Sequence, residues 1–146
     1  MTKAEKQTLK TAISELEKIG KETTGTKWEY VIEIPMKLPS LNDYIRACRG
    51  NKYGANNIKK TLESEIAYYL APLPRFEKPV KIHFLWIEET KRRDYDNIAF
   101  AKKFILDALQ KSGKLKNDNR KWVKGFMDDF EYGEQGVIIT IREVTR

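Results

Sequence analysis

The sequence predicts an α+β protein, in which a small mixed sheet of about four strands carries helices packed on it. Two observations predict this class. Segments of helical and of strand periodicity alternate along the chain, in the order helix, strand, helix, strand, helix, strand, strand. The length of 146 residues corresponds to one domain, and a domain of about 150 residues buries roughly 70% of the surface of its unfolded chain.

The chain opens with a predicted helix at residues 3–19, where apolar residues recur at helical spacing and a glycine follows. A linker at 21–27 comes next. Residues 28–36 alternate between two faces and predict a strand.

Residues 37–44 (KLPSLNDY) contain turn formers and predict a loop that leads into a helical segment. Residues 50–57 predict a flexible basic stretch because of their glycines and asparagines. A helix is expected at 57–70, ended by two prolines, and a strand at 80–89. One face of this strand is expected to be buried. Its residues are either Ile82, Phe84 and Trp86 or their neighbours in the strand.

One long helix is predicted at 97–113, with Gly113 just past its end. A basic loop at 114–121 follows it. The last two strands are expected at 122–132 and 136–143, around a glycine-containing turn.

The net charge of +7 is concentrated in two segments: residues 37–60 carry +5 and residues 91–124 carry +7, so the remainder is negative. Lysine and arginine clusters favour a polyanionic partner such as nucleic acid, although a solvated surface would have the same composition. No apolar run reaches the ~18 residues of a membrane helix, so we expect a cytoplasmic protein without a membrane partner. With one cysteine, Cys48, and one histidine, His83, an internal disulfide and a cysteine-rich zinc site are excluded.

The stretch KRRDYDN, residues 91–97, places two carboxylates beside three cations. If the chain is extended before the helix, Asp94 and Asp96 point the same way and meet at its end. Carboxylate oxygens suit a hard cation such as Mg²⁺. The alternative is that one aspartate caps the helix, with Arg92 and Arg93 as partners.

The predicted helix adds further polar residues on the face of Asp96. Lys103 follows Asp96 by seven residues, so it lies nearly in register with it and is placed to contact a phosphate. The alternative for Lys103 is an ion pair with Asp107. Asp118, in the basic loop, is either a third metal ligand or a turn residue. A metal site that cleaves phosphodiesters needs this combination, with carboxylates to hold the metal and cations to hold the phosphate backbone.

Other acidic residues compete for the same role. They are interpreted as solvated strand ends, with a smaller chance that one joins a metal site. These residues are Glu88, Glu89, Asp128, Asp129 and Glu131.

Four motifs in order resemble the RusA family of Holliday-junction resolvases. They are Leu38-Pro39-Ser40-Leu41-Asn42, Arg93-Asp94-Tyr95-Asp96-Asn97, Asp107-Ala108-Leu109 and the Asn-Asp at 117–118. The resemblance spans about residues 29–144. It implies a RusA-like domain at 28–146, with residues 1–27 outside the family core.

The resemblance implies a Mg²⁺-dependent endonuclease, often phage-encoded, with Mn²⁺ as a substitute ion. Such enzymes act in DNA recombination and repair as homodimers and cut four-way branched DNA by paired symmetric nicks. Asp94, Asp96 and Asp118 would hold the metal, and Lys103, with Lys102 as the alternative, would stabilise the phosphate. The residues expected to bind DNA are Arg46, Arg49, Lys52, Lys59, Lys60, Arg92, Arg93, Lys114, Lys116, Arg120 and Lys121.

A homodimer agrees with the near two-fold symmetry of a four-way junction, since paired nicks need two symmetric active sites. Phe100 and Phe104 widen the apolar face of the predicted helix, for which core packing is favoured over a subunit contact. The rival function is a non-catalytic module that structures branched DNA. It would keep the basic segments without needing clustered carboxylates.

Overall fold

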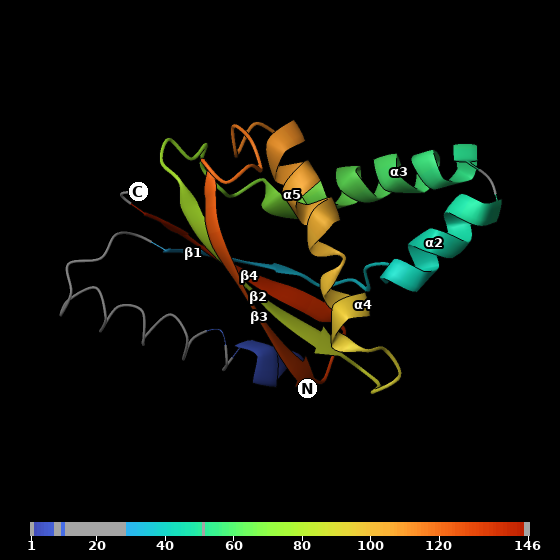
Figure 1. Cartoon of the computed structure of the whole chain (residues 1–146). Helices are drawn as coiled ribbons and strands as arrows, with labels where there is room; N and C mark the ends of the chain where they lie inside the picture. Colours follow the sequence, from blue (N-terminus) through green and yellow to red (C-terminus); the bar gives the residue numbers. More distant parts are fainter. Residues whose placement is uncertain (1, 8–9, 11–28, 51, 145–146) are drawn as a thin grey trace.

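The computed structural model describes residues 2–7, 10, 29–50 and 52–144 of the chain (Figure 1). Most of the predicted N-terminal helix and all of its linker lie outside these residues. The described part of that helix, from residue 3 to residue 7 and at residue 10, is helical. None of the helices in the described ranges is long and apolar enough to cross a membrane.

The described chain forms a four-stranded mixed sheet with helices packed on it, which confirms the α+β prediction. In chain order the elements are β1 (Glu29–Ile34), α2 (Leu41–Gly50), α3 (Lys52–Leu70), β2 (Val80–Glu88), α4 (Tyr95–Ala99), α5 (Lys102–Lys111), β3 (Val123–Tyr132) and β4 (Gly136–Glu143). The strand order is β1-β4-β2-β3.

Strand β2 lies between β4 and β3, antiparallel to the first and parallel to the second. The parallel register runs from Val80 opposite Val123 to Glu88 opposite Tyr132. Parallel neighbours need a crossover connection, and α4 and α5 supply it here. Strands β1 and β3 are the two edges of the sheet.

The main core lies between the helices and one face of the sheet. On β2, the side chains of Ile82, Phe84 and Trp86 are buried in it, as predicted. The intervening Leu85 and Ile87 are also buried, in a small cluster on the opposite face. Both faces of the central strand are therefore apolar.

The prediction of a flexible stretch at residues 50–57 is wrong, because α3 begins at Lys52. Glycine and asparagine favour turns, but Ala55 is buried at helical spacing from the apolar residues that follow, and packing outweighs local preference. Figure 1 shows α2 and α3 projecting beyond the sheet as an arm, with the C-terminal part of α3 against α5. The basic segment at 46–60 is consequently helical.

Ser40 and Asp43 form a capping box at the start of α2. The Asp43 amide donates to the Ser40 hydroxyl at 3.1 Å, and the Ser40 amide donates to the Asp43 carboxylate at 3.0 Å. The predicted loop at 37–44 therefore ends at Ser40.

The single helix predicted at 97–113 is divided into α4 and α5. Around Ala101 the hydrogen bonds span three residues: its amide bonds the Ile98 carbonyl at 3.2 Å, and the Phe104 amide bonds the Ala101 carbonyl at 3.0 Å. This tighter winding turns the second helix relative to the first. Phe104 is buried and Phe100 packs on the same core, in agreement with the core-packing interpretation of both rings.

Candidate active site

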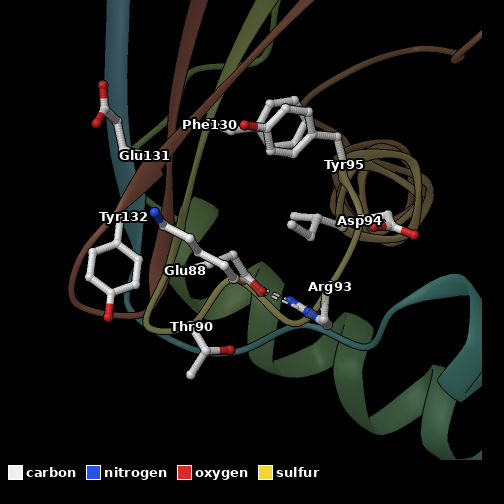
Figure 2. A pocket seen from close by; sticks show the side chains of 10 residues that line it. Glu88, Thr90, Arg93, Asp94, Tyr95, Phe130, Glu131 and Tyr132 are labelled. Carbon is white, nitrogen blue, oxygen red and sulfur yellow. Dashed lines mark hydrogen bonds and ion pairs between the residues drawn. The ribbon is translucent and has the colours of Figure 1, made fainter.

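One ion pair fixes the segment between β2 and α4. Nε of Arg93 lies 2.7 Å from Oε1 of Glu88, and Nη2 lies 2.8 Å from Oε2. Nη1 donates to the Leu38 carbonyl at 2.9 Å. The two charged side chains keep only 15% and 10% of their surface exposed. This bidentate pair ties the RRDYDN segment to the end of β2 and to the loop before α2 (Figure 2).

A cavity of about 670 Å³ opens beside this pair, between the ends of β2 and β3 and the start of α4. On one side, the ring of Tyr95 stacks on Phe130, with centroids 4.1 Å apart and planes within 11°. Asp94 and Glu131 also line the cavity. Figure 2 shows their carboxylates on opposite sides of it, so they do not converge on one point.

Asp94 and Asp96 are both exposed at the start of α4. Asp94 occupies the N-cap position, with extended backbone angles, but its side chain makes no capping hydrogen bond. The capping alternative therefore does not account for this carboxylate. Asp96 lies within the first turn of α4, so the extended segment that was expected to align both side chains ends at Asp94.

Asp118 lies in the loop between α5 and β3, where it is exposed. This loop precedes Val123, at the amino end of the β2–β3 pair, whereas Asp94 follows the carboxyl end of β2. Eight residues of parallel strand separate the two ends by roughly 26 Å. Within the described residues, no group of three or more acidic, histidine or cysteine side chains is placed to hold a metal ion. Within one protomer, Asp118 therefore lies at the opposite end of the β2–β3 pair from Asp94 and Asp96.

The two candidate lysines have different surroundings. Lys102 is half-buried, and its Nζ lies 2.5 Å from Oδ2 of Asp128 and 4.9 Å from the centroid of the Phe126 ring. Lys103 is exposed on α5. Asp96 lies on α4 and Lys103 on α5, which are separate helices. A spacing of seven residues therefore does not place the two side chains on one face, as it would in a continuous helix. The assignment of Lys103 stays a prediction.

Two acidic residues interpreted as solvated strand ends are instead engaged in the fold. Glu88 is buried with Arg93 and also accepts a hydrogen bond from the Gln135 amide. Asp128 accepts from the Trp86 indole at 2.8 Å and pairs with Lys102. Strand alternation in the sequence could have predicted the burial of Glu88, because this residue shares a face of β2 with buried apolar residues.

The predicted DNA-binding residues fall in three regions: the arm, the segment before α4 and the loop before β3. On the arm, Arg46, Arg49 and Lys60 are exposed, whereas Lys59 lies 3.4 Å from Asp107. Lys52 is the first residue of α3.

In the loop before β3, Lys114 donates to the carbonyls of Ala71 and Leu73, at 3.2 and 2.7 Å. Lys116 lies 3.7 Å from Glu77. The remaining predicted residues that are exposed, one before α4 and two in this loop, are Arg92, Arg120 and Lys121.

Three groups on α2 and α5 have shifted pKa values. The Ser40 amide, through its hydrogen bond, lowers the pKa of Asp43. Burial raises the pKa of Tyr44. The hydrogen bond to Glu63, at 2.5 Å, raises the pKa of Lys111. These groups take part in the cap of α2, in the packing of α2 on Phe104 and in the ion pair between α3 and α5.

A comparison with known families matches residues 19–142 to the family described as Endodeoxyribonuclease RusA. No curated protein matches the chain. The matched range includes Asp94, Asp96 and Asp118 and covers most of the chain. Enzymes of this family are metal-dependent and act on branched DNA, which favours the endonuclease over the non-catalytic module. The chain belongs to the RusA family of Holliday-junction endodeoxyribonucleases.

Proposed function

We propose that this endonuclease resolves four-way junctions as a homodimer with Mg²⁺, by paired symmetric nicks. The observation that carries the proposal is the exposed Asp94–Asp96 pair at the end of β2. The bidentate contact between Arg93 and Glu88 holds the segment that presents these carboxylates. The Asp94 side chain makes no capping hydrogen bond, so its carboxylate is available to bind a metal ion.

Asp94, Asp96 and Asp118 are proposed as the metal ligands, because carboxylate oxygens are the ligands that Mg²⁺ prefers. The set does not fit within one protomer, since Asp118 lies at the other end of the β2–β3 pair. When bound, the ion would stabilise negative charge on the phosphate. Lys103 would add a positive charge at the same phosphate.

The arm and the basic loop are proposed to bind the DNA backbone. Arg46, Arg49 and Lys60 are exposed on the arm, and Arg120 and Lys121 are exposed in the loop. Phosphate contacts of this kind are independent of sequence, so they position the junction without selecting the cleavage site. The buried Arg93 contributes by holding its segment in place.

The test is a cleavage assay on a labelled four-way junction and a matching linear duplex, with Mg²⁺ or with EDTA. Wild type should nick the junction symmetrically and leave the duplex intact. Asp96→Asn should bind the junction without cutting it. A matched control is Glu33→Gln, which removes one carboxylate from β1 at the opposite edge of the sheet and should cut normally. Cutting by Asp96→Asn at the wild-type rate would refute the proposed ligand set.

A further inference from the structure

A second cavity, of about 390 Å³, opens at the amino end of β2, on the face of the sheet opposite the main core. Asp94 and Asp96, by contrast, follow the carboxyl end of this strand. Several of the lining side chains alternate along β2 and its neighbours with core residues such as Ile82 and Phe84, so they point away from the helices. The titratable residues of the lining are Glu29, Lys81, His83, Lys124 and Arg142.

The register of the sheet places two cations side by side in this cavity. Lys81 on β2 lies directly opposite Arg142 on β4. Like charges at opposed positions of an antiparallel pair are destabilising. Glu29 offsets them only in part, since its carboxylate lies 3.9 Å from the Arg142 guanidinium, and His83 is already paired with Asp129 at 2.7 Å. The cavity therefore keeps an excess of positive charge, which an anion would neutralise.

An irregularity in strand β3 adds a third cation. Val80 pairs with Val123 and Lys81 pairs with Gly125, so Lys124 is an extra residue in the register of β3. Lys124 is exposed, and it lines the same cavity. An extra residue in a strand re-aims a side chain, and such irregularities are frequent beside functional sites. The local break in pairing thus brings a charge to a place where two like charges already lie.

The cavity also offers space and a hydroxyl group. A side-chain carbon at Gly125 would meet no atom within 4 Å, so the surface of the strand is open there. Glycine inside a strand often marks a site where a ligand approaches the backbone closely. Thr140, which lines the cavity, is 7% exposed, and its hydroxyl oxygen is buried without a hydrogen-bond partner among the described residues. An oxygen of a bound anion would accept the hydrogen bond that this hydroxyl lacks.

The cavity continues the basic loop that precedes β3. The Val80 amide donates to the Trp122 carbonyl at 2.8 Å, which holds the start of β2 against the end of this loop (Figure 1). Arg120 and Lys121 are exposed in the loop, and Lys124 follows them on β3. Each strand of duplex DNA carries one charge per about 3.4 Å of helix axis, so one backbone would contact both the loop and the cavity. This continuity favours a DNA backbone over a small anion.

We propose that Lys81, Lys124 and Arg142 form a second phosphate-binding surface, which holds a duplex arm of the junction on the sheet face opposite the helices. The inference rests on the proposed function, because it adds a contact to the same DNA. The surface lies away from Asp94 and Asp96, so it positions an arm of the junction and takes no part in the cutting step.

Lys81→Gln in the full chain distinguishes this role from a structural one. The substitution removes the repulsion with Arg142, so the midpoint of thermal unfolding should rise by about 1 °C. It also removes one phosphate contact, so affinity for a labelled four-way junction should fall roughly eightfold at 0.1 M salt. The slope of log affinity against log salt should fall by about 0.9. Calorimetry measures the midpoint, and fluorescence anisotropy in EDTA measures binding without cutting.

Two further substitutions at the same position sharpen the test. Lys81→Glu places opposite charges across the strands, so it should raise the midpoint further and weaken binding more than Lys81→Gln. Lys81→Arg keeps the charge and should bind the junction as wild type does. A matched control is Lys3→Gln, which removes an exposed cation near Lys6. Because Lys6 contacts the Gln135 carbonyl, at the other end of β4 from Arg142, this control should leave the slope unchanged.

Gly125→Val tests the surface without changing its charge. Its side chain enters open space on a strand, where a β-branched residue is favourable, so the midpoint should not fall. The added side chain should obstruct the approach of the DNA backbone and lower the affinity for the junction.

The outcomes separate this inference from the proposed function. If the wild type binds the junction and both Lys81→Gln and Gly125→Val bind it equally well, the second surface is wrong and the proposed function stands. Equal losses in Lys81→Gln and Lys3→Gln would reveal a general effect of net charge and would also overturn the surface. A lower unfolding midpoint in Lys81→Gln would assign Lys81 a structural role instead. A wild type that does not bind the junction would overturn both proposals.

Discussion

The two ends of the β2–β3 pair differ in charge and in how firmly their segments are held. At the carboxyl end, Asp94 and Asp96 are exposed beside a buried ion pair that fixes their segment. At the amino end, Asp118 lies in an exposed loop rich in lysine and arginine. The first end presents both signs of charge, because Lys91 and Arg92 are exposed beside Asp94 and Asp96, whereas the loop at the second end has four cations and one carboxylate. The proposed metal ligands Asp94 and Asp96 thus follow a segment held by a buried ion pair, whereas the proposed phosphate contacts lie in an exposed loop.

The largest expected effect on stability is at the carboxyl end. Glu88→Gln would leave the Arg93 guanidinium largely buried without its charged partner, at a cost of about 3 kcal/mol. In a protein of this size the midpoint of thermal unfolding should fall by roughly 10 °C. Calorimetry measures the shift, and cleavage should weaken because the segment of Asp94 is loosened.

The matched control lies at the amino end. Glu77→Gln removes the exposed partner of Lys116, 3.7 Å away, and should change stability by less than about 0.5 kcal/mol. Equal effects of the two substitutions would mean that the ion pair of Glu88 does not hold the carboxyl end.

The next comparison concerns the two lysines of α5. If Lys103 contacts the phosphate, Lys103→Met should lower the cleavage rate by about 100-fold and leave the unfolding transition unchanged. Lys102→Met removes the partner of Asp128 and should cost about 1 kcal/mol of stability, with a smaller effect on cleavage. Single-turnover kinetics and thermal unfolding measure the two quantities. The reverse pattern would identify Lys102 as the lysine of the active site.

A smaller effect is expected at the capping box of α2, which orders the base of the arm. Ser40→Ala should cost about 1 kcal/mol. Since the pKa of Asp43 is lowered in the folded state, its contribution is present above its unfolded pKa of about 3.9 and is lost as pH falls through the folded pKa. Urea unfolding should show a steeper loss of stability below pH 4 for wild type than for Asp43→Asn.

Apolar periodicity predicted the class of the fold, the four strands and the buried face of α5. It did not predict the division at Ala101, because residues 98–109 keep a helical pattern across it and only the three-residue hydrogen bonds reveal the turn. The burial of Glu88 follows from strand alternation, but its partner Arg93 is fixed by the turn between them. The separation of Asp118 depends on β3 being parallel to β2, which no spacing within one sequence determines.

The smallest effects should come from single phosphate contacts on the arm and in the loop before β3. Arg49→Ala on the arm and Arg120→Ala in the loop should each reduce the slope of log affinity against log salt by about 0.9, on junction and duplex alike. Fluorescence anisotropy at several salt concentrations measures this slope. Lys59→Ala is the informative control, because its ammonium already lies 3.4 Å from Asp107 and should reduce the slope less. If Lys59→Ala matches Arg49→Ala, a phosphate must replace Asp107 as the partner of the Lys59 ammonium when DNA binds.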